Sequence, residues 1–352
     1  MFSEIGSEFW KADIIDNQVR TFDNYHRYLL TGRTALDYII KDIKASRPFN
    51  IIYMPSYCCH TMIKPFIENN VAVIFYDVSF IEGQYTYNVD FDIKCDAILI
   101  MHYFGFYNQK VPEIIAGFKD KDKLIIEDAT HSWFQKEPYS IESDYVFASF
   151  RKWTGLPCGA IVIKKDCEFT IPINLYNDKY IELRKQAAKL KREYVEKAIG
   201  EKSNYLEAFS YAEEYLEQDY MYYGIPHEIK EIIDRIDYKK ITGKRIKNAH
   251  YLVNGLRNIN KIDTITMSDE DTPIFVPIII KDGTRDELRK YLISKSIYCP
   301  VHWPLTDEHK IDNTFLYDNG LSLVCDQRYN ITDMKRILQR IGEFFGEYIV
   351  EC

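Results

Sequence analysis

Glycine and proline are scarce in this chain, with 15 and 12 among 352 residues. That scarcity argues against a collagen-like chain and against a low-complexity disordered one. Apolar residues make up 46% of the sequence and aromatic residues 15%. This content supports a large core, and the length is typical of about two domains. We therefore expect an ordinary globular protein.

Basic residues are outnumbered, since 45 Lys and Arg stand against 53 Asp and Glu, for a net charge of −8. Proteins that act mainly on nucleic acid are usually basic, so we expect small-molecule partners and no nucleic acid. The sequence lacks an apolar run of about 18 residues that could span a membrane. It also lacks an N-terminal signal pattern, so we expect no membrane association and a cytoplasmic location.

The eight cysteines form no C-x-x-C pair, and no histidines accompany them at zinc spacing. We therefore predict no metal site and no disulfide framework, and a reducing compartment suits these thiols. Cys58 and Cys59 are adjacent, and small buried hydrophobic residues are the simplest interpretation of both.

Short apolar runs alternate with helical patterns between residues 31 and 165, which predicts an α/β fold with a mostly parallel sheet. The runs are apolar enough to be buried on both faces. They are NIIYMP, VAVIFYDV, DAILIMHYFG, KLIIEDAT, DYVFASF and GAIVIKK. Ligands of such sheets bind beyond the carboxyl ends of the strands. By position alone, Asp128, His131, Ser149 and Lys152 are candidate site residues.

Long helices rich in Lys, Glu and Tyr are predicted over residues 174–260. The basic stretch 185–202 is followed at once by acidic SYAEEYLEQDY, which favours a solvated helix face over a nucleic-acid or membrane role. After residue 260, the run IFVPIII, a helix over 285–294 and a final helix near 331–348 indicate a second unit. We expect a large domain of residues 1–260, mainly helical over 174–260, and a smaller C-terminal α+β domain of residues 261–352.

Three features that a pyridoxal phosphate (PLP) site needs occur in order along the chain: a helix N-terminus for the phosphate, a carboxylate for the pyridine nitrogen and a lysine for covalent attachment. Thr31, Gly32, Arg33 and Thr34 precede an apolar helix. Their backbone N–H groups, with the threonine hydroxyls, could bind an anion there. Ordinary helix capping explains the same residues, so this feature alone is weak.

Asp128 ends the apolar run KLIIED, so its carboxylate could reach the sheet edge and keep a pyridine nitrogen protonated. His131 could hydrogen-bond the cofactor's phenolic oxygen or the substrate. The alternative is that Asp128 caps a helix and His131 is a packed surface histidine.

Ser149 and Lys152 follow the run DYVFASF in the stretch S-F-R-K-W-T-G. The hydroxyl of Ser149 could contact phosphate, and Lys152 could form a Schiff base if a partly buried site beside other cations activates its amine. Most lysines at strand ends are simply solvated. However, Lys152 lies one strand-loop-strand step after Asp128, which predicts that both face the same sheet edge.

The order of short motifs resembles a known family. The motifs T-G-R-T-A-L, M-P-S-Y, Y-D-V, H-Y-F-G, I-E-D-A-T-H-S and S-F-R-K are similar to those of the DegT/StrS-type PLP-dependent sugar aminotransferases. The resemblance covers nearly the whole chain, and I-E-D-A is its most specific piece. It implies the PLP-dependent transferase fold type I, the aspartate aminotransferase fold class, and a homodimer.

The resemblance also implies roles for single residues. Asp128 would pair with the pyridine nitrogen, and Lys152 would attach the cofactor. Arg33 and Thr34 would bind the phosphate, assisted by Ser149. A further residue would stack on the cofactor ring: the candidates are Tyr57 and His60, because the family's usual aromatic falls at Cys59 in this chain.

Some positions depart from the family pattern at the site. The usual F-S-F-x-x-x-K followed by T-G-E-G-G is here A-S-F-R-K-W-T-G-L-P-C-G, so the loop around Lys152 must differ. The N-Y-R segment, with which a neighbouring subunit reaches the phosphate, has no clear counterpart at residues 223–229. His131 stands where the family often has Gln.

Substrate-facing candidates in the C-terminal unit are His302, Trp303, Asp326, Gln327 and Arg328. Arg328 could pair bidentately with the carboxylate of an amino donor, as guanidinium geometry favours. Alternatively, D-Q-R-Y is a strand-to-helix cap with a surface arginine.

The implied function is transfer of an amino group from an amino acid such as glutamate to a keto acceptor. The family suggests a nucleotide-linked keto-sugar as that acceptor, in polysaccharide or antibiotic sugar synthesis. Two alternatives stay open. One is a PLP enzyme of another reaction type, such as elimination, decarboxylation or aldol cleavage, because the lysine loop is altered. The other is a non-catalytic scaffold of the same fold.

Overall fold

An eight-stranded sheet dominates the computed structural model, which describes residues 4–16 and 25–347. Its strands are β2 (Tyr25–Leu29), β3 (Ile51–Pro55), β4 (Ala72–Ile81), β5 (Gln84–Asn88), β6 (Ala97–Met101), β7 (Leu124–Asp128), β8 (Tyr145–Ser149) and β9 (Ala160–Lys164). They are ordered β2-β9-β8-β7-β6-β3-β4-β5. The central strands from β8 to β4 pair in parallel. Strand β9 pairs antiparallel with both β8 and β2, and β5 pairs antiparallel with β4. The predicted, mostly parallel sheet is confirmed.

The central strands are apolar because neither face of the sheet meets water. Every residue of β6, β8 and β9 is buried. The covering helices of this part are α1 (Gly32–Ser46), α2 (His60–Glu68) and α3 (Val111–Lys119). Helix α1 lies against β8 and β9, α2 against α1 and β4, and α3 against β7. This order is the one expected for strands buried on both sides by crossover helices.

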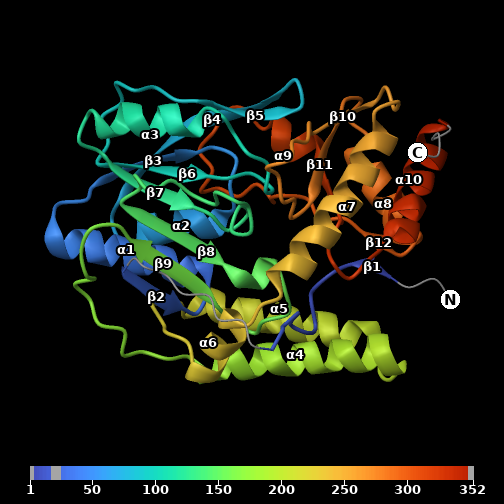
Figure 1. Cartoon of the computed structure of the whole chain (residues 1–352), viewed down its shortest axis with the longest axis horizontal. Helices are drawn as coiled ribbons and strands as arrows, with labels where there is room; N and C mark the ends of the chain where they lie inside the picture. Colours follow the sequence, from blue (N-terminus) through green and yellow to red (C-terminus); the bar gives the residue numbers. More distant parts are fainter. Residues whose placement is uncertain (1–3, 17–24, 348–352) are drawn as a thin grey trace.

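Four helices follow the large sheet: α4 (Asp178–Lys197), α5 (Lys202–Gln218), α6 (His227–Asp234) and α7 (Tyr238–Leu256). The predicted helical character of residues 174–260 is confirmed. Helices α4 and α5 pack against each other along one side of the molecule (Figure 1), with Ala187, Tyr205 and Phe209 in a small core between them. No helix in the described part of the chain is long and apolar enough to cross a bilayer.

The C-terminal elements form a separate antiparallel sheet with its own helices, drawn orange to red in Figure 1. The strands are β10 (Ile262–Thr264), β11 (Val276–Ile280) and β13 (Gly320–Leu323), and the helices are α8 (Arg285–Ser294), α9 (Phe315–Asn319) and α10 (Ile331–Phe345). The helices predicted over 285–294 and near 331–348 are confirmed. The last residue of α10 is Phe345, and Gly346 caps the helix in a left-handed conformation.

The C-terminal elements also contact earlier parts of the chain. The short strand β1 (Ile5–Gly6) pairs in parallel with β12 (Ile297–Tyr298). Helix α10 packs against α7, which precedes residue 260. The division of the chain into domains at residue 260 stays a prediction.

Candidate active site

The carboxyl ends of β7 and β8 bring the predicted site residues together. These strands are parallel neighbours, and each ends in a predicted residue: β7 at Asp128 and β8 at Ser149. A hydrogen-bond chain joins the two ends. The Thr130 amide donates to Oδ1 of Asp128 at 2.8 Å, and the Ser149 amide donates to Oγ1 of Thr130 at 3.2 Å. Thr130, which the sequence interpretation did not single out, thus fixes the spacing of the two strand ends.

The N-terminus of α1 closes one side of this edge. A Cβ built on Gly32 would lie 3.6 Å from Cβ of Ser149, so the first turn of the helix abuts the end of β8. The amides of Gly32 and Arg33 occupy the first positions of the helix, where no intrahelical carbonyl can accept from them. The hydroxyl of Ser149 has no hydrogen-bond partner among the described residues. Donors therefore gather at the positive end of α1, which suits an anion.

The threonine hydroxyls of this turn serve the helix itself. Oγ1 of Thr31 accepts from the Thr34 amide at 3.3 Å, and Oγ1 of Thr34 accepts from the Thr31 amide at 2.8 Å, which forms a capping box. Thr34 also donates its hydroxyl proton to the carbonyl of Thr31. The capping interpretation therefore accounts for the hydrogen bonds of both hydroxyls. A phosphate at this turn would be bound by backbone amides rather than by the hydroxyl of Thr34.

Arg33 is buried beside this turn with part of its guanidinium unused. Its Nη1 lies 2.8 Å from Oε2 of Glu217 as an ion pair, and the guanidinium sits 5.2 Å from the ring centre of Tyr220. The side chain is only 8% exposed, and its Nε has no hydrogen-bond partner in the described chain, whereas Nη1 is paired with Glu217. Buried donors of this kind are costly unless a partner is provided, and a phosphate would provide one.

Asp128 is buried at the strand end with 4% of its surface exposed. Burial raises the pKa of its carboxyl to about 6, against the lowering effect of the Thr130 hydrogen bonds and the charges of His102 and Lys152. A carboxylate that is destabilised in this way gains from a partner that supplies a proton or a positive charge, as a pyridinium N–H does.

Lys152 lies on the short 3₁₀ turn Phe150–Lys152 that follows β8. Its side chain is exposed and has no hydrogen-bond or ion-pair partner within the described residues. Burial is the largest influence on the pKa of six groups around Lys152, and in each of them the positive charge of Lys152 acts to lower the pKa: Glu8, Cys59, Asp128, His131, Glu213 and His302. These groups come from different elements, so Lys152 is the point on which they converge.

The neutral rings of His131 and His302 and the indole of Trp303 lie together near the predicted site. His131 accepts a hydrogen bond from the Phe104 amide at Nδ1, 3.2 Å away, so its ring proton sits on Nε2. Its ring stacks with Trp303 at 6.2 Å and 12°. Burial holds the pKa of His131 well below its usual value and lowers that of His302 to about 3, so both are neutral. The structure thus brings His302 and Trp303 of the C-terminal unit to the predicted site.

Tyr57 lies in a packed aromatic cluster rather than on an open face. It is 3% exposed, and its ring is surrounded by those of Tyr85, Tyr103, Trp303 and Tyr317 at 5.1 to 6.1 Å. Little of the Tyr57 ring is therefore exposed, and its stacking on a cofactor ring stays a prediction.

Cys59, two residues further on, has a different environment. It precedes the first turn of α2 and is partly exposed. Its Sγ accepts a hydrogen bond from the Thr61 hydroxyl at 3.1 Å and lies 3.9 Å from Nδ1 of His60. Burial raises the pKa of the Cys59 thiol, but these hydrogen-bonding contacts outweigh burial and bring the pKa below its usual value. A thiol with a lowered pKa therefore occupies the place where the sequence resemblance locates an aromatic ring.

The candidates Asp326, Gln327 and Arg328 are engaged within the protein. Arg328 pairs with Asp326 at 2.7 Å and donates to the backbone carbonyls of Ser7 and Glu8. Gln327 accepts from Arg245 and donates to the carbonyl of Trp153. Of the two interpretations of D-Q-R-Y, these contacts favour the structural one, because they occupy the guanidinium that a substrate carboxylate would need.

An ion-pair network behind Lys152 was not predicted. Glu213 of α5 accepts from Arg151 at 2.6 Å and from Arg184 at 3.0 Å. Burial raises the pKa of Glu213, but the charges of these arginines and of Lys152 outweigh it and bring the value to about 2. No sequence signal marks Glu213, because it lies on a helix whose pattern is that of a solvated surface. Within residues 4–16 and 25–347, no three His, Cys, Asp or Glu side chains are grouped to hold a metal ion.

The residues present fit a PLP group. The buried Nε of Arg33, the helix N-terminus and the free hydroxyl of Ser149 suit its phosphate. The carboxylate of Asp128 suits its ring nitrogen, and the amine of Lys152 suits its aldehyde carbon.

Comparison with known proteins finds similar folds and no similar sequences. No protein-family model matches the chain, and no curated protein matches it. Helicobacter pylori PseC, an aminotransferase involved in the biosynthesis of pseudoaminic acid, is 13% identical with a TM-score of 0.67, over 97% of this chain and 100% of that one. NtdA of Bacillus subtilis, with bound cofactor PMP, is 14% identical with a TM-score of 0.64, over 92% and 74% of the two chains.

A third solved structure is that of DesI in the presence of its TDP-sugar product. It is 14% identical with a TM-score of 0.61, over 93% of this chain and 82% of that one. Similarity at these identities shows the fold. The chain has the fold of these proteins, and the predicted fold class, PLP-dependent transferase fold type I, is confirmed.

Proposed function

We propose that this chain is a PLP-dependent aminotransferase of the DegT/StrS type. The observation that carries the proposal is the convergence of an unpaired amine, Lys152, with the buried carboxylate of Asp128 and the donor-rich N-terminus of α1 at one sheet edge. Each feature alone is common in proteins, but cofactor binding explains all of them together.

The residues take separate roles in this proposal. Gly32, Arg33 and Ser149 would hold the phosphate, and Asp128 would hold the ring nitrogen. Lys152 would attach the cofactor and then move the proton at the Cα of the substrate, acting as base and acid in turn. The bound cofactor supplies an electron sink and a carrier for the amino group.

His131 and Trp303 would border the reacting centre. The neutral ring of His131 presents an Nε2 proton, because Nδ1 already accepts from a backbone amide. A neutral donor of this kind can bind a phenolic or carbonyl oxygen without adding charge to the site.

The proposed reaction moves an amino group from an amino acid, with glutamate as the expected donor, to a keto acceptor. Glutamate leaves as its 2-keto acid, so donor and acceptor exchange an amino group for a keto oxygen. We propose a nucleotide-linked keto-sugar as the acceptor. The names of the similar structures support this choice, since one describes a TDP-sugar product and another an aminotransferase in the biosynthesis of pseudoaminic acid. We also propose a homodimer, which the mass of the protein in solution would test.

A direct test is chemical mapping of the attachment point. The protein is incubated with PLP, reduced with borohydride, digested and analysed by mass spectrometry. We expect the added mass on the peptide that contains Lys152, and no such peptide from Lys152→Ala. A matched control is Lys165→Ala, which removes a lysine whose amine pairs with Glu142 at the far end of β9. Labelling on other lysines with Lys152 unmodified would contradict the proposal.

A further inference from the structure

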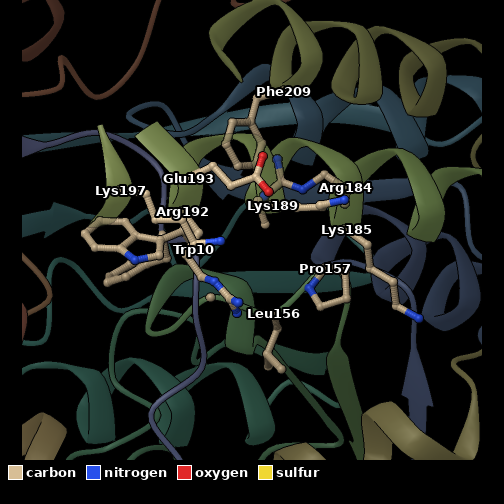
Figure 2. A pocket seen from close by; sticks show the side chains of 13 residues that line it. Trp10, Leu156, Pro157, Arg184, Lys185, Lys189, Arg192, Glu193, Lys197 and Phe209 are labelled. Atoms are coloured by element: carbon tan, nitrogen blue, oxygen red, sulfur yellow. The ribbon is translucent and has the colours of Figure 1, made fainter. Parts of the chain in front are cut away.

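Helix α5 directs one row of side chains at the arginines around the candidate active site. Phe209, Glu213 and Glu217 follow one another at four-residue spacing, so they lie along the same side of the helix. Phe209 lines a cavity together with Arg184 of α4 (Figure 2), and the guanidinium of Arg184 lies 4.7 Å from the centre of its ring. The row continues through the two glutamates to Arg33, at the N-terminus of α1.

The carboxylate of Glu217 has basic side chains at both of its oxygens. Nη1 of Arg33 lies 2.8 Å from Oε2, and Nζ of Lys64 lies 2.7 Å from Oε1. Nε2 of His60 lies 3.9 Å from Oε2. Burial raises the pKa of Glu217, but Lys64 and Arg33 outweigh burial and hold the pKa below its usual value. Basic groups of α1 and α2 therefore surround one carboxylate of α5, in the way that they would surround a phosphate.

Glu217 supplies the negative charge that Arg33 needs while the phosphate site is empty. Among the residues that the structure describes, it is the one carboxylate within ion-pair distance of Arg33. A buried guanidinium without a counter-charge is strongly destabilising, and the positive end of α1 adds to that cost. An incoming phosphate, in turn, meets an arginine that is already paired and a carboxylate that repels it.

The two partners of this ion pair differ in their freedom to move. The side chain of Arg33 is 8% exposed, and the ring of Tyr220 lies 5.2 Å from its guanidinium. The side chain of Glu217 is 36% exposed. A carboxylate at the surface is hydrated as soon as it leaves the pair, whereas the buried guanidinium would stay desolvated. Glu217 is therefore the partner that can turn away when another anion binds to Arg33.

We propose that Glu217 is an internal counter-ion that occupies Arg33 in the empty site and competes there with the phosphate of PLP. The inference rests on the proposed function, because it assigns Arg33 to that phosphate. When the phosphate binds, Arg33 exchanges a carboxylate for an anion of higher charge, and Glu217 turns toward water. One residue of α5 thus stabilises the cofactor-free protein and limits how tightly the site holds its cofactor.

Glu217→Gln should change stability and affinity in opposite directions. Gln is similar in size to Glu but carries no charge. The cofactor-free variant should unfold at a lower urea concentration than the unmodified protein, because Arg33 loses its counter-charge. Inorganic phosphate and PLP should bind to it roughly two- to tenfold more tightly, because the repelling carboxylate is gone. A merely structural role of Glu217 would lower the stability without raising the affinity for an anion.

Calorimetric titration of the cofactor-free protein with inorganic phosphate, and an absorption titration with PLP, measure the affinities. The matched control is Glu214→Gln, which removes an exposed carboxylate of α5 that accepts a hydrogen bond from Ser210, and it should bind both probes as the unmodified protein does. Glu217→Asp keeps the charge and should resemble the unmodified protein more than Glu217→Gln does. Added phosphate should raise the urea midpoint of Glu217→Gln by more than that of the unmodified protein, so the comparison holds even if the empty variant is unstable.

The outcomes separate this inference from the proposed function. If PLP attaches at Lys152 and Glu217→Gln binds phosphate and PLP no more tightly than Glu214→Gln does, the counter-ion role is wrong and the aminotransferase proposal stands. If Glu217→Gln binds both probes more weakly, Glu217 orients Arg33 for the phosphate instead of competing with it, which also overturns the inference. If PLP does not attach at Lys152 in the unmodified protein, both proposals fail.

Discussion

Replacing Asp128 by Asn should stabilise the cofactor-free protein while it impairs the proposed chemistry. The usual pKa of an aspartic acid, 3.8, rises to about 6 for Asp128 because of burial. A shift of about two units corresponds to about 3 kcal/mol at 1.36 kcal/mol per unit. An ionised Asp128 therefore destabilises the empty site at neutral pH, and Asn, which is neutral and similar in shape, removes that cost.

The sign of the pH dependence follows from the raised pKa. Below about pH 4 the carboxyl is protonated in both the folded and the unfolded chain, so it costs nothing. As the pH rises, the unfolded chain releases the proton first, and the folded state loses stability until the pH passes about 6. The advantage of Asp128→Asn should thus grow from about 1.6 kcal/mol at pH 5 to about 3 kcal/mol at pH 8.

Urea unfolding of the cofactor-free protein at both pH values measures this difference. Asp326→Asn is the matched control, since the charge of Arg328 outweighs burial and lowers the pKa of Asp326, so that its neutralisation should destabilise the protein. Equal stability of Asp128→Asn and the unmodified protein at pH 8, or a difference that does not change with pH, would refute the reasoning.

Two further predictions concern a thiol and the core. Hydrogen bonds with His60 and Thr61 bring the pKa of the Cys59 thiol below its usual value although burial raises it, so iodoacetamide at pH 7 should modify Cys59 faster than the exposed Cys167. Mass spectrometry of the labelled peptides measures the order of modification. Faster modification of Cys167 would contradict this description of the Cys59 environment. Leu99→Ala in β6, where the side chain is fully buried, should lower the free energy of unfolding by about 2–5 kcal/mol in urea titrations, and a loss well under 1 kcal/mol would mean that β6 is not central to the core.

The central strands could be predicted because their apolar runs are long enough to be buried on both faces. The same pattern placed Asp128 and Ser149 at neighbouring strand ends, where the structure has them. The edge strand β2, with the sequence YHRYL, was not predicted. Its polar residues alternate poorly, and it becomes a strand only because β9 offers an antiparallel partner.

Contacts between distant segments account for what the sequence did not reveal. His131 follows a strand of the large sheet, whereas its stacking partner Trp303 belongs to the C-terminal part of the chain. No local sequence pattern predicts a contact between residues so far apart. Tyr57 was expected at the cofactor because of its place in a motif, but four aromatic neighbours enclose it. The role of Glu213 depends on arginines from two other segments.

The visible absorption spectrum of the protein purified with PLP, recorded before and after the addition of glutamate, would show whether Lys152 holds the cofactor. We expect a visible band of the lysine-bound cofactor that is lost when glutamate is added as the amino donor. The band should be missing from Lys152→Ala. Absence of any visible band from the unmodified protein would contradict the claim that this sheet edge holds PLP.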